Sequence, residues 1–138
     1  APQHPLVQIA SGGEKSRIML AFKAALATRH TVPTIVLDEI DTGVSGDVAS
    51  RMAKSMKDMA KVQQVFSVTH LAQVAALGDE HLEITKTNST ITSKAITQAN
   101  FLKGDDCTEA IAKMLSGRTI TDEARAQARV LRTSNRGI

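Results

Sequence analysis

The stretch TIVLDEIDTGVSG, Thr34 to Gly46, decides the fold class of this chain. Its first residues form a short apolar run rich in β-branched side chains, which is typical of a strand buried on both faces in a parallel sheet. Two carboxylates, Asp38 and Glu39, follow the run directly, and a glycine-containing loop follows them. A buried strand that ends in acids places them at the carboxyl edge of its sheet, where α/β folds bind ligands.

Helices and strands alternate on both sides of this stretch. Upstream, apolar side chains recur at helical spacing after a Ser-Gly-Gly-Glu turn at residues 11–14, and downstream a second helix should turn one face inward. The inward-facing side chains of this second helix are expected to be Val48, Met52, Met56 and Met59. A second apolar run, Val65–Thr69, predicts another buried strand, which ends at His70.

The second half of the chain has a different character. Apolar and polar residues alternate from Leu82, and Ile91–Ile96 is expected to return beside them as the second strand of a β-hairpin. Two helices follow: Asp106 and Glu109 have the spacing of a capping box for the first, and Thr121 is expected to cap the last. The order of elements predicts an α/β layered unit, in which helices flank parallel strands and a hairpin and two C-terminal helices follow.

Composition limits the classes of function. The 138 residues make up one domain's worth of chain, and the 42% of hydrophobic residues is ordinary for a globular protein. The single cysteine, Cys107, excludes a disulfide framework and a multi-thiolate zinc site. A formal net charge of +3 permits contact with nucleic acid without arguing for it. No apolar run approaches membrane-spanning length, so we expect no membrane partner.

Asp38 and Glu39 are the first candidate site. In phosphoryl-transfer enzymes an aspartate at the end of such a strand holds Mg²⁺, and an adjacent glutamate can polarise a water molecule. The alternative is that both side chains stand in solvent at the start of a loop. The residues alone leave both interpretations open.

His70 and the turn Ser11-Gly12-Gly13-Glu14 are the other two candidates. His70 ends the second parallel strand and should lie near the acids, although a single histidine is more often structural than catalytic. Gly12 and Gly13 leave the first amides of the upstream helix bare, so a phosphate could approach them with the help of the helix dipole. The alternative is a helix capped by Ser11 and Glu14 after a flexible turn.

Together, the three candidates resemble the C-terminal half of an ABC-type ATPase head, a P-loop NTPase fold. The turn at residues 11–14 resembles the signature motif, the acids 38–39 resemble Walker B with its catalytic glutamate, and His70 resembles the switch histidine.

Longer stretches narrow the resemblance within that superfamily. DEIDTGVSG at residues 38–46, THLAQVAALG at 69–78 and IAKMLSG at 111–117 are similar to the RecN family of bacterial DNA-repair proteins, which are relatives of the SMC proteins. The resemblance implies a role in DNA double-strand break repair and recombination through an ATP-gated dimerisation of heads. Alternatives are the head lobe of another SMC-like or ABC-type ATPase, or a dimerisation module without hydrolysis, against which Glu39 argues.

The resemblance implies specific roles in ATP hydrolysis. Asp38 would help to place Mg²⁺ through a water molecule, Glu39 would orient the attacking water, and His70 would sense the γ-phosphate. The signature residues 11–14 would contact, in trans, an ATP molecule held by another subunit. The D-loop would include Gly43 and Ser45.

Parts of such a head are missing from these residues. The glycine positions that Walker A requires before Lys15 and Ser16 are occupied by Ile9 and Glu14, and there is no Q-loop or coiled-coil heptad stretch. We therefore expect residues 1–138 to be a C-terminal lobe, inactive as an ATPase without the N-terminal lobe. Its expected partners are that lobe, a second copy and DNA bound independently of sequence, in the bacterial cytoplasm at the nucleoid.

The last helix carries a row of arginines. Arg125, Arg129, Arg132 and Arg136 follow helical spacing, and such a face can meet the phosphate backbone of DNA. The alternative, which we favour, is a solvated face with cations near the C-terminus of a helix.

Overall fold

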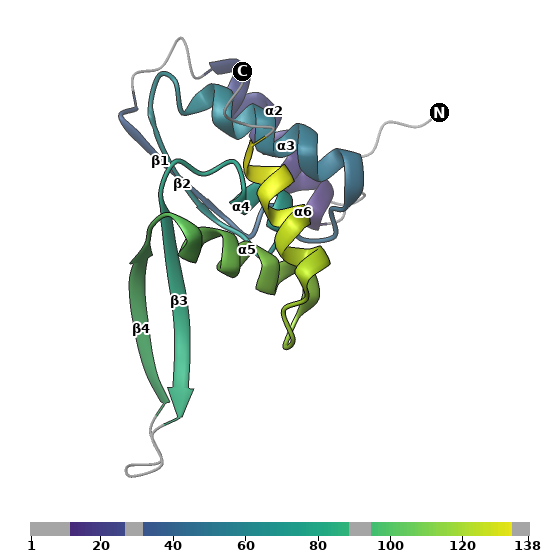
Figure 1. Ribbon diagram of the computed structural model, residues 1–138. Coiled ribbons are helices and arrows are strands. Elements are labelled where there is room, and N and C mark those ends of the chain that lie inside the picture. Colours follow the sequence, from purple (N-terminus) through teal and green to yellow (C-terminus); the bar gives the residue numbers. More distant parts are fainter. Residues whose placement is uncertain (1–11, 27–31, 89–94, 134–138) are drawn as a thin grey trace. The chain divides into compact units, whose positions relative to one another are not determined.

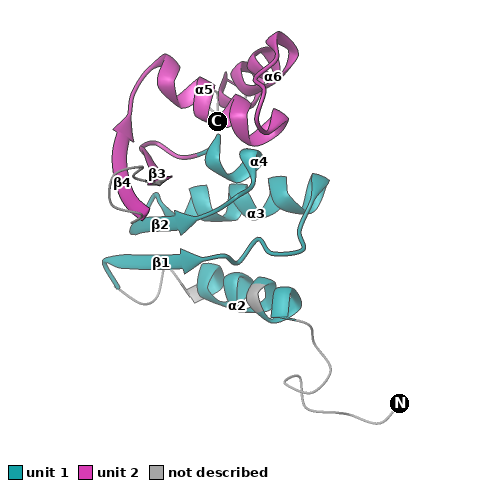
Figure 2. Cartoon of the chain, turned by 90° about the horizontal axis from the view of Figure 1, so that it is seen from below, with its two compact units in different colours: residues 1–77 teal, residues 78–138 magenta. Residues whose placement is uncertain are grey.

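The computed structural model describes residues 12–26, 32–88 and 95–133 (Figure 1). The chain divides into two compact units, residues 1–77 and residues 78–138 (Figure 2).

The first unit is built on a two-stranded parallel sheet. Its elements are α2 (Gly12–Leu26), β1 (Thr34–Asp38), α3 (Gly46–Met59), β2 (Gln64–Val68) and α4 (Ala72–Ala75). β1 and β2 pair in parallel, with Thr34 opposite Gln64 and Asp38 opposite Val68. Parallel strands need a long crossover between them, and α3 supplies it. The predicted alternation of helix and parallel strand is confirmed.

The core of the first unit lies on one face of this sheet. Leu37 of β1 is buried there against Leu20 of α2 and the inner side of α3. The buried side chains of α3 are Ala49, Met52, Ala53, Met56 and Met59. The three methionines were predicted to face inward, whereas the same prediction for Val48 was wrong: its side chain is exposed, and the small Ala49 and Ala53 occupy the buried stripe instead.

The opposite face of the sheet is exposed, so the prediction of strands buried on both faces was wrong. Val36, Phe66 and Val68 are 63%, 53% and 53% exposed. Successive side chains of a strand point to opposite faces, and the described core residues of this unit gather on the face that carries Leu37. The sequence pattern therefore identified a sheet with two apolar faces, of which this unit covers one.

Part of the predicted apolar stripe of α2 is exposed as well. Ile18 and Phe22, two of the side chains that indicated helical periodicity, are exposed, whereas Leu20 is buried; Leu26, also in the predicted stripe, has no described side chain. The helix itself was predicted correctly, because periodicity alone does not say which side meets the core.

The second unit consists of a hairpin and two helices. Its elements are β3 (His81–Asn88), β4 (Ala95–Leu102), α5 (Asp105–Ser116) and α6 (Asp122–Thr133). β3 and β4 run antiparallel with His81 opposite Leu102 (Figure 1). The hairpin was predicted, and its second strand is described from Ala95; the predicted start at Ile91 lies outside the described residues. The register pairs all eight described residues of each strand.

The helices α5 and α6 pack against each other. Ile111 and Ala112 of α5 and Ala128 of α6 are fully buried. Thr121 caps α6 as predicted, because its hydroxyl accepts a hydrogen bond of 3.2 Å from the Ala124 N–H. None of the described helices has both the length and the apolar composition that crossing a membrane requires.

The predicted capping box at the start of α5 was wrong. The helix begins at Asp105, with Gly104 as its N-cap at a φ of 56° and no side-chain cap hydrogen bond, so Asp106 lies inside the first turn instead of at the cap. Glu109 instead accepts a hydrogen bond of 2.8 Å from Arg125 of α6. The Glu109 side chain therefore forms an ion pair with another helix instead of the cap interaction that its spacing in the sequence predicted.

Candidate functional site

Two adjacent strands end at the same edge of the first unit's sheet. Asp38 is the last residue of β1 and lies opposite Val68, the last residue of β2. The Glu39 N–H donates a hydrogen bond of 3.2 Å to the Val68 carbonyl, which extends the pairing by one residue. The structure thus brings Asp38, Glu39 and the residues that follow Val68, including His70, to one edge of the sheet.

Glu39 has an unusual backbone conformation. Its φ is 47°, and among the described residues it is the only non-glycine with a positive φ. The conformation is held by Thr42, whose N–H and hydroxyl both donate to the Glu39 carbonyl, at 3.3 and 2.9 Å. A non-glycine residue in this region costs about 1 kcal/mol, and such strain is concentrated at functional sites. The Glu39 side chain is exposed on this fixed backbone.

Asp38 is the candidate for metal binding. Its side chain is exposed at the end of β1, and the described part of the chain contains no cluster of three His, Cys, Asp or Glu side chains that could hold a metal ion. Mg²⁺ is commonly held by one or two carboxylates together with substrate phosphates and water. The residues therefore fit a Mg²⁺ ion that arrives with a nucleotide, and do not fit a site built from protein ligands alone.

Asp41 is a residue of this edge that sequence reasoning missed. It is 1% exposed, and its Oδ2 accepts a hydrogen bond from the Thr69 hydroxyl. Its Oδ1 lies 3.6 Å from Nδ1 of His70, whose side chain remains 63% exposed. The sequence showed Asp41 as a third acid after β1, but nothing in the local pattern distinguishes a buried carboxylate from an exposed one.

The two glycines at the start of α2 have different surroundings. A Cβ atom at Gly13 would lie 2.7 Å from the Thr42 carbonyl oxygen, whereas a Cβ at Gly12 would meet nothing within 4 Å. Gly13 is therefore required by the close approach of α2 to the loop after β1. Of the two glycines, only Gly12 leaves room for a Cβ atom among the described residues. Glu14 is exposed in the first turn of the helix, and Ser11 lies outside the described residues.

The loop before α3 contains the predicted D-loop residues. Gly43 has a φ of 71°, in the region that favours glycine. Val44 is buried, and its N–H donates a hydrogen bond of 3.0 Å to the Asp41 carbonyl. Ser45 is the N-cap of α3, but its side chain makes no cap hydrogen bond and is exposed. The loop is thus anchored by Val44, with Ser45 on its surface.

The arginine row on α6 is largely occupied by contacts within the second unit. Arg125 donates to Glu109 at 2.8 Å and to Asp122 at 3.0 Å, and the hydrogen bond with Glu109 raises the pKa of its guanidinium most. Arg132 donates to the Gly104 carbonyl at 2.8 Å and to the buried Thr108 hydroxyl at 2.6 Å. These contacts favour the structural interpretation of the row. Of the other two arginines, Arg129 is exposed and Arg136 lies outside the described residues.

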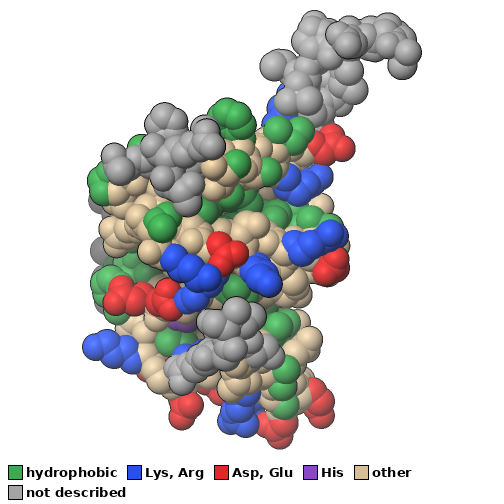
Figure 3. Space-filling view, turned by 90° about the horizontal axis from the view of Figure 1, so that it is seen from above, with side chains coloured by type: hydrophobic (Ala, Val, Ile, Leu, Met, Phe, Trp, Pro, Cys, Tyr) green, Lys and Arg blue, Asp and Glu red, His purple; other side chains and the backbone are tan. Residues whose placement is uncertain are grey.

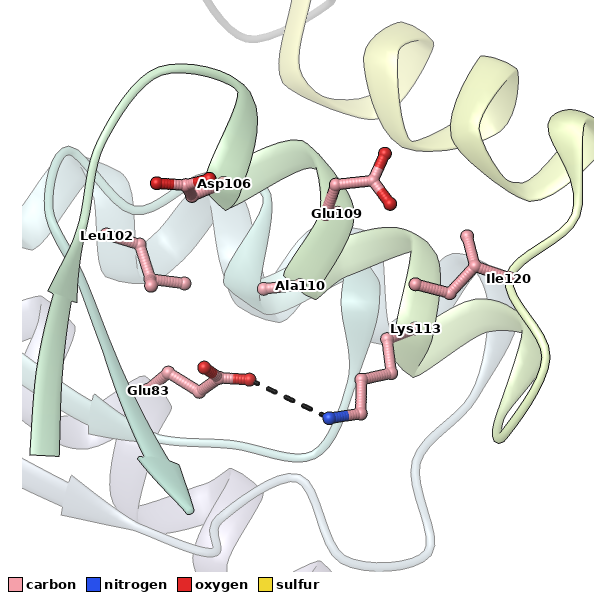
Figure 4. A pocket seen from close by; sticks show the side chains of 7 residues that line it. All are labelled: Glu83, Leu102, Asp106, Glu109, Ala110, Lys113 and Ile120. Atoms are coloured by element: carbon pink, nitrogen blue, oxygen red, sulfur yellow. Dashed lines mark ion pairs between the residues drawn. The ribbon is translucent and has the colours of Figure 1, made fainter. Parts of the chain in front are cut away.

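Neither the face shown in Figure 3 nor the described pocket of the second unit suggests another phosphate site. Acidic and basic side chains are interspersed on the face shown in Figure 3. A pocket of about 250 Å³ lies between the hairpin and α5, and the ion pair Lys113–Glu83, at 4.0 Å, spans part of it (Figure 4). Glu83, Asp106 and Glu109 line this pocket and would repel a phosphate.

Comparison with known proteins identifies the family. No family model matches the chain. It is 39% identical over 130 residues to the DNA repair protein RecN of Halalkalibacterium halodurans, 42% over 124 residues to that of Rickettsia conorii and 43% over 129 residues to that of Xylella fastidiosa strain 9a5c. These matches cover 90–94% of this chain but only 22–23% of each relative.

A solved structure shows the same fold. It comes from work on ATP-driven dimerisation and DNA-stimulated activation of SMC ATPases, and it matches with a TM-score of 0.59 at 20% sequence identity. The match covers 82% of this chain and 66% of that one. The chain shares its fold with an SMC ATPase. By its similarity to the RecN proteins, it belongs to the RecN family, and it spans somewhat less than a quarter of the length of these relatives.

Proposed function

We propose that this chain is the C-terminal lobe of an ATPase head in a RecN-type protein that repairs DNA double-strand breaks by recombination. In this proposal, ATP binding closes two heads and hydrolysis opens them again. The main observation behind this proposal is that β1 and β2 end at the same edge of the sheet. Asp38, His70 and Glu39, with its strained backbone, all lie at this edge. Membership of the RecN family and the fold shared with an SMC ATPase support it.

The residues at this edge have separate roles in hydrolysis. Bound Mg²⁺ would supply positive charge that neutralises the phosphates, and Asp38 would help to hold it. The Glu39 carboxylate, fixed by its backbone conformation, orients the attacking water and accepts its proton. His70, whose ring is largely exposed, contacts the terminal phosphate.

The start of α2 completes a site on a second copy of the protein. Ser11, Gly12, Gly13 and Glu14 act as the signature motif. Gly12 borders open space, and the N-terminus of a helix attracts phosphate through its N–H groups and its dipole. The motif contacts, in trans, an ATP molecule bound to the other subunit, and Gly43 and Ser45 lie in the D-loop between the two sites.

A further lobe of the same polypeptide covers the exposed face of the sheet. Val36, Phe66 and Val68 form an apolar surface on that face, and parallel sheets are normally covered on both faces. The relatives are roughly four times as long as this chain, which spans 22–23% of them. We assign Walker A and a coiled coil to the remainder, and we expect residues 1–138 alone to be inactive. DNA binding is independent of sequence, in the bacterial cytoplasm at the nucleoid.

Replacing Glu39 by glutamine tests this function. In a polypeptide of the relatives' length that contains this segment, Glu39→Gln should lower ATP turnover by about 100-fold or more, because the water loses its proton acceptor. ATP binding should persist, since the amide keeps the shape of the side chain. The matched control is Glu123→Gln, an exposed glutamate at the start of α6, which should leave turnover unchanged. Wild-type turnover in Glu39→Gln would contradict the proposed function.

A further inference from the structure

Asp41 is a buried charged residue that the proposed reaction does not use. Among the described residues, only Asp41 and Thr108 are buried polar or charged side chains, and Asp41 is 1% exposed. Removing a carboxylate from water costs free energy unless hydrogen bonds compensate for it. The groups that contact the Asp41 carboxylate therefore indicate what this buried charge does.

One oxygen of Asp41 is fully engaged with the end of β2. The Thr69 hydroxyl donates to Oδ2 across a sequence separation of 28 residues, and the same hydroxyl accepts a hydrogen bond of 3.0 Å from the Leu71 N–H. Asp41 and Leu71 thus hold the Thr69 side chain from both sides. Because Thr69 and Leu71 flank His70, this arrangement fixes the backbone that carries the histidine.

The other oxygen of Asp41 has no such partner. Oδ1 is buried and accepts no hydrogen bond from any described residue. The Nδ1 atom of His70 lies 3.6 Å away, which is slightly too long for a hydrogen bond. In enzymes without bound substrate, hydrogen bonds of this kind are often long and shorten when the reactive complex forms. The unsatisfied oxygen therefore faces the one ring that the proposed function places at the phosphate.

We propose that Asp41 is a positioning residue for His70: its Oδ1 accepts a hydrogen bond from Nδ1–H and so directs Nε2 toward the nucleotide. The inference rests on the proposed role of His70. The hydrogen bond that one ring nitrogen makes decides which tautomer a histidine adopts. With Nδ1–H directed at the carboxylate, Nε2 accepts a hydrogen bond when it carries no proton, and donates one to a phosphate oxygen when it does.

The tautomer of His70 is the direct test. In the 138-residue chain with ¹⁵N-labelled histidine rings, we expect the neutral His70 ring to carry its hydrogen on Nδ1, as shown by long-range ¹H–¹⁵N spectra. The His70→Gln variant assigns the signal among the four histidines of the chain. A neutral His70 ring protonated mainly on Nε2 in the wild-type chain would overturn the proposal without any substitution.

Asp41→Asn extends the test to a variant of the same size. The carbonyl of the introduced amide can accept the Thr69 hydroxyl while its NH₂ group faces His70, so the ring should switch to the Nε2–H tautomer. In the longer polypeptide, turnover should fall by about 10- to 100-fold, as is usual when the partner that orients a functional histidine is lost. Asp58→Asn, at an exposed aspartate of α3 paired with Lys61, is the matched control and should change neither quantity.

The outcomes separate this inference from the proposed function. A tautomer switch in Asp41→Asn with no loss of turnover in Glu39→Gln would leave Asp41 as the positioning residue of a histidine that serves another reaction. An unchanged tautomer in a folded Asp41→Asn chain would overturn the inference even if Glu39→Gln is inactive. If Asp41→Asn does not fold, the wild-type tautomer decides.

Discussion

The two units of the chain differ in how completely their polar groups are satisfied. In the first unit, Glu39 has a strained backbone, and the buried Oδ1 of Asp41 accepts no hydrogen bond from the described residues. In the second unit, Arg125 and Arg132 are both engaged, and Thr121 caps its helix. Strain and unsatisfied groups are stable only where the surrounding structure supports them, and they mark functional sites. The difference supports the proposal that residues 1–77 carry the chemistry, while the contacts of residues 78–138 are structural.

Substitutions that change stability test this comparison of the two units, and we expect the largest effect at Gly13. Gly13→Ala would place a methyl group 2.7 Å from the Thr42 carbonyl oxygen, and overpacking of this kind typically costs about 1–3 kcal/mol. We therefore expect a lower free energy of unfolding for the 138-residue chain in urea.

Gly12→Ala is the matched control for this prediction. Its methyl group would meet open space, so stability should change by no more than about 0.5 kcal/mol. Equal stability of the two variants would mean that Gly13 is not needed for the approach of α2 to the loop after β1.

A smaller effect is expected in the second unit, from Arg132. Arg132→Gln removes hydrogen bonds to the Gly104 carbonyl and to the buried Thr108 hydroxyl, at a cost of about 1 kcal/mol. Thermal unfolding should shift down by a few degrees. Arg129→Gln, at an exposed position of the same helix, should leave the midpoint unchanged.

DNA affinity distinguishes the two interpretations of the arginine row. If the row is structural, Arg132→Gln and Arg129→Gln in the longer polypeptide should bind DNA as the wild type does at low salt. A loss of affinity in both variants, with a weaker dependence on salt, would show that the second unit contacts the phosphate backbone.

The features predicted from sequence are those that depend on local pattern. The β-branched run from Thr34 and the acids after it predicted a parallel strand and the carboxyl edge of its sheet. His70 was placed at the same edge because neighbouring parallel strands end together. Thr121 was identified as a cap because capping is a local interaction. Glycine and hydroxyl residues next to a segment of periodic hydrophobicity indicate where a helix begins or ends, and this signal lies within a few positions of the boundary.

The features that were missed depend on contacts between distant residues. The burial of Asp41 follows from its contact with Thr69, 28 positions away. The capping box predicted for α5 does not form because Glu109 pairs with Arg125 of another helix. Likewise, the exposure of Val36 depends on which layers cover the sheet. None of these can be read from spacing along one segment.

Subunit mixing tests most directly the claim that the first unit forms a composite ATPase site. In the longer polypeptide, Gly12→Asp places a carboxylate where the neighbour's phosphate should approach, in open space and at a helix N-terminus that tolerates it. Glu39→Gln removes the proton acceptor. Each homodimer then has two defective sites, whereas a mixed dimer has one intact site and one site with both defects.

Mixing the two variants should therefore restore ATP turnover, to about a quarter of the wild-type value at a 1:1 ratio if pairing is random and the sites are independent. Subunit exchange should be shown separately by copurification of differently tagged copies. If exchange occurs and no activity returns at any mixing ratio, Gly12 does not act on a nucleotide bound to the other subunit, and the account of this site is wrong.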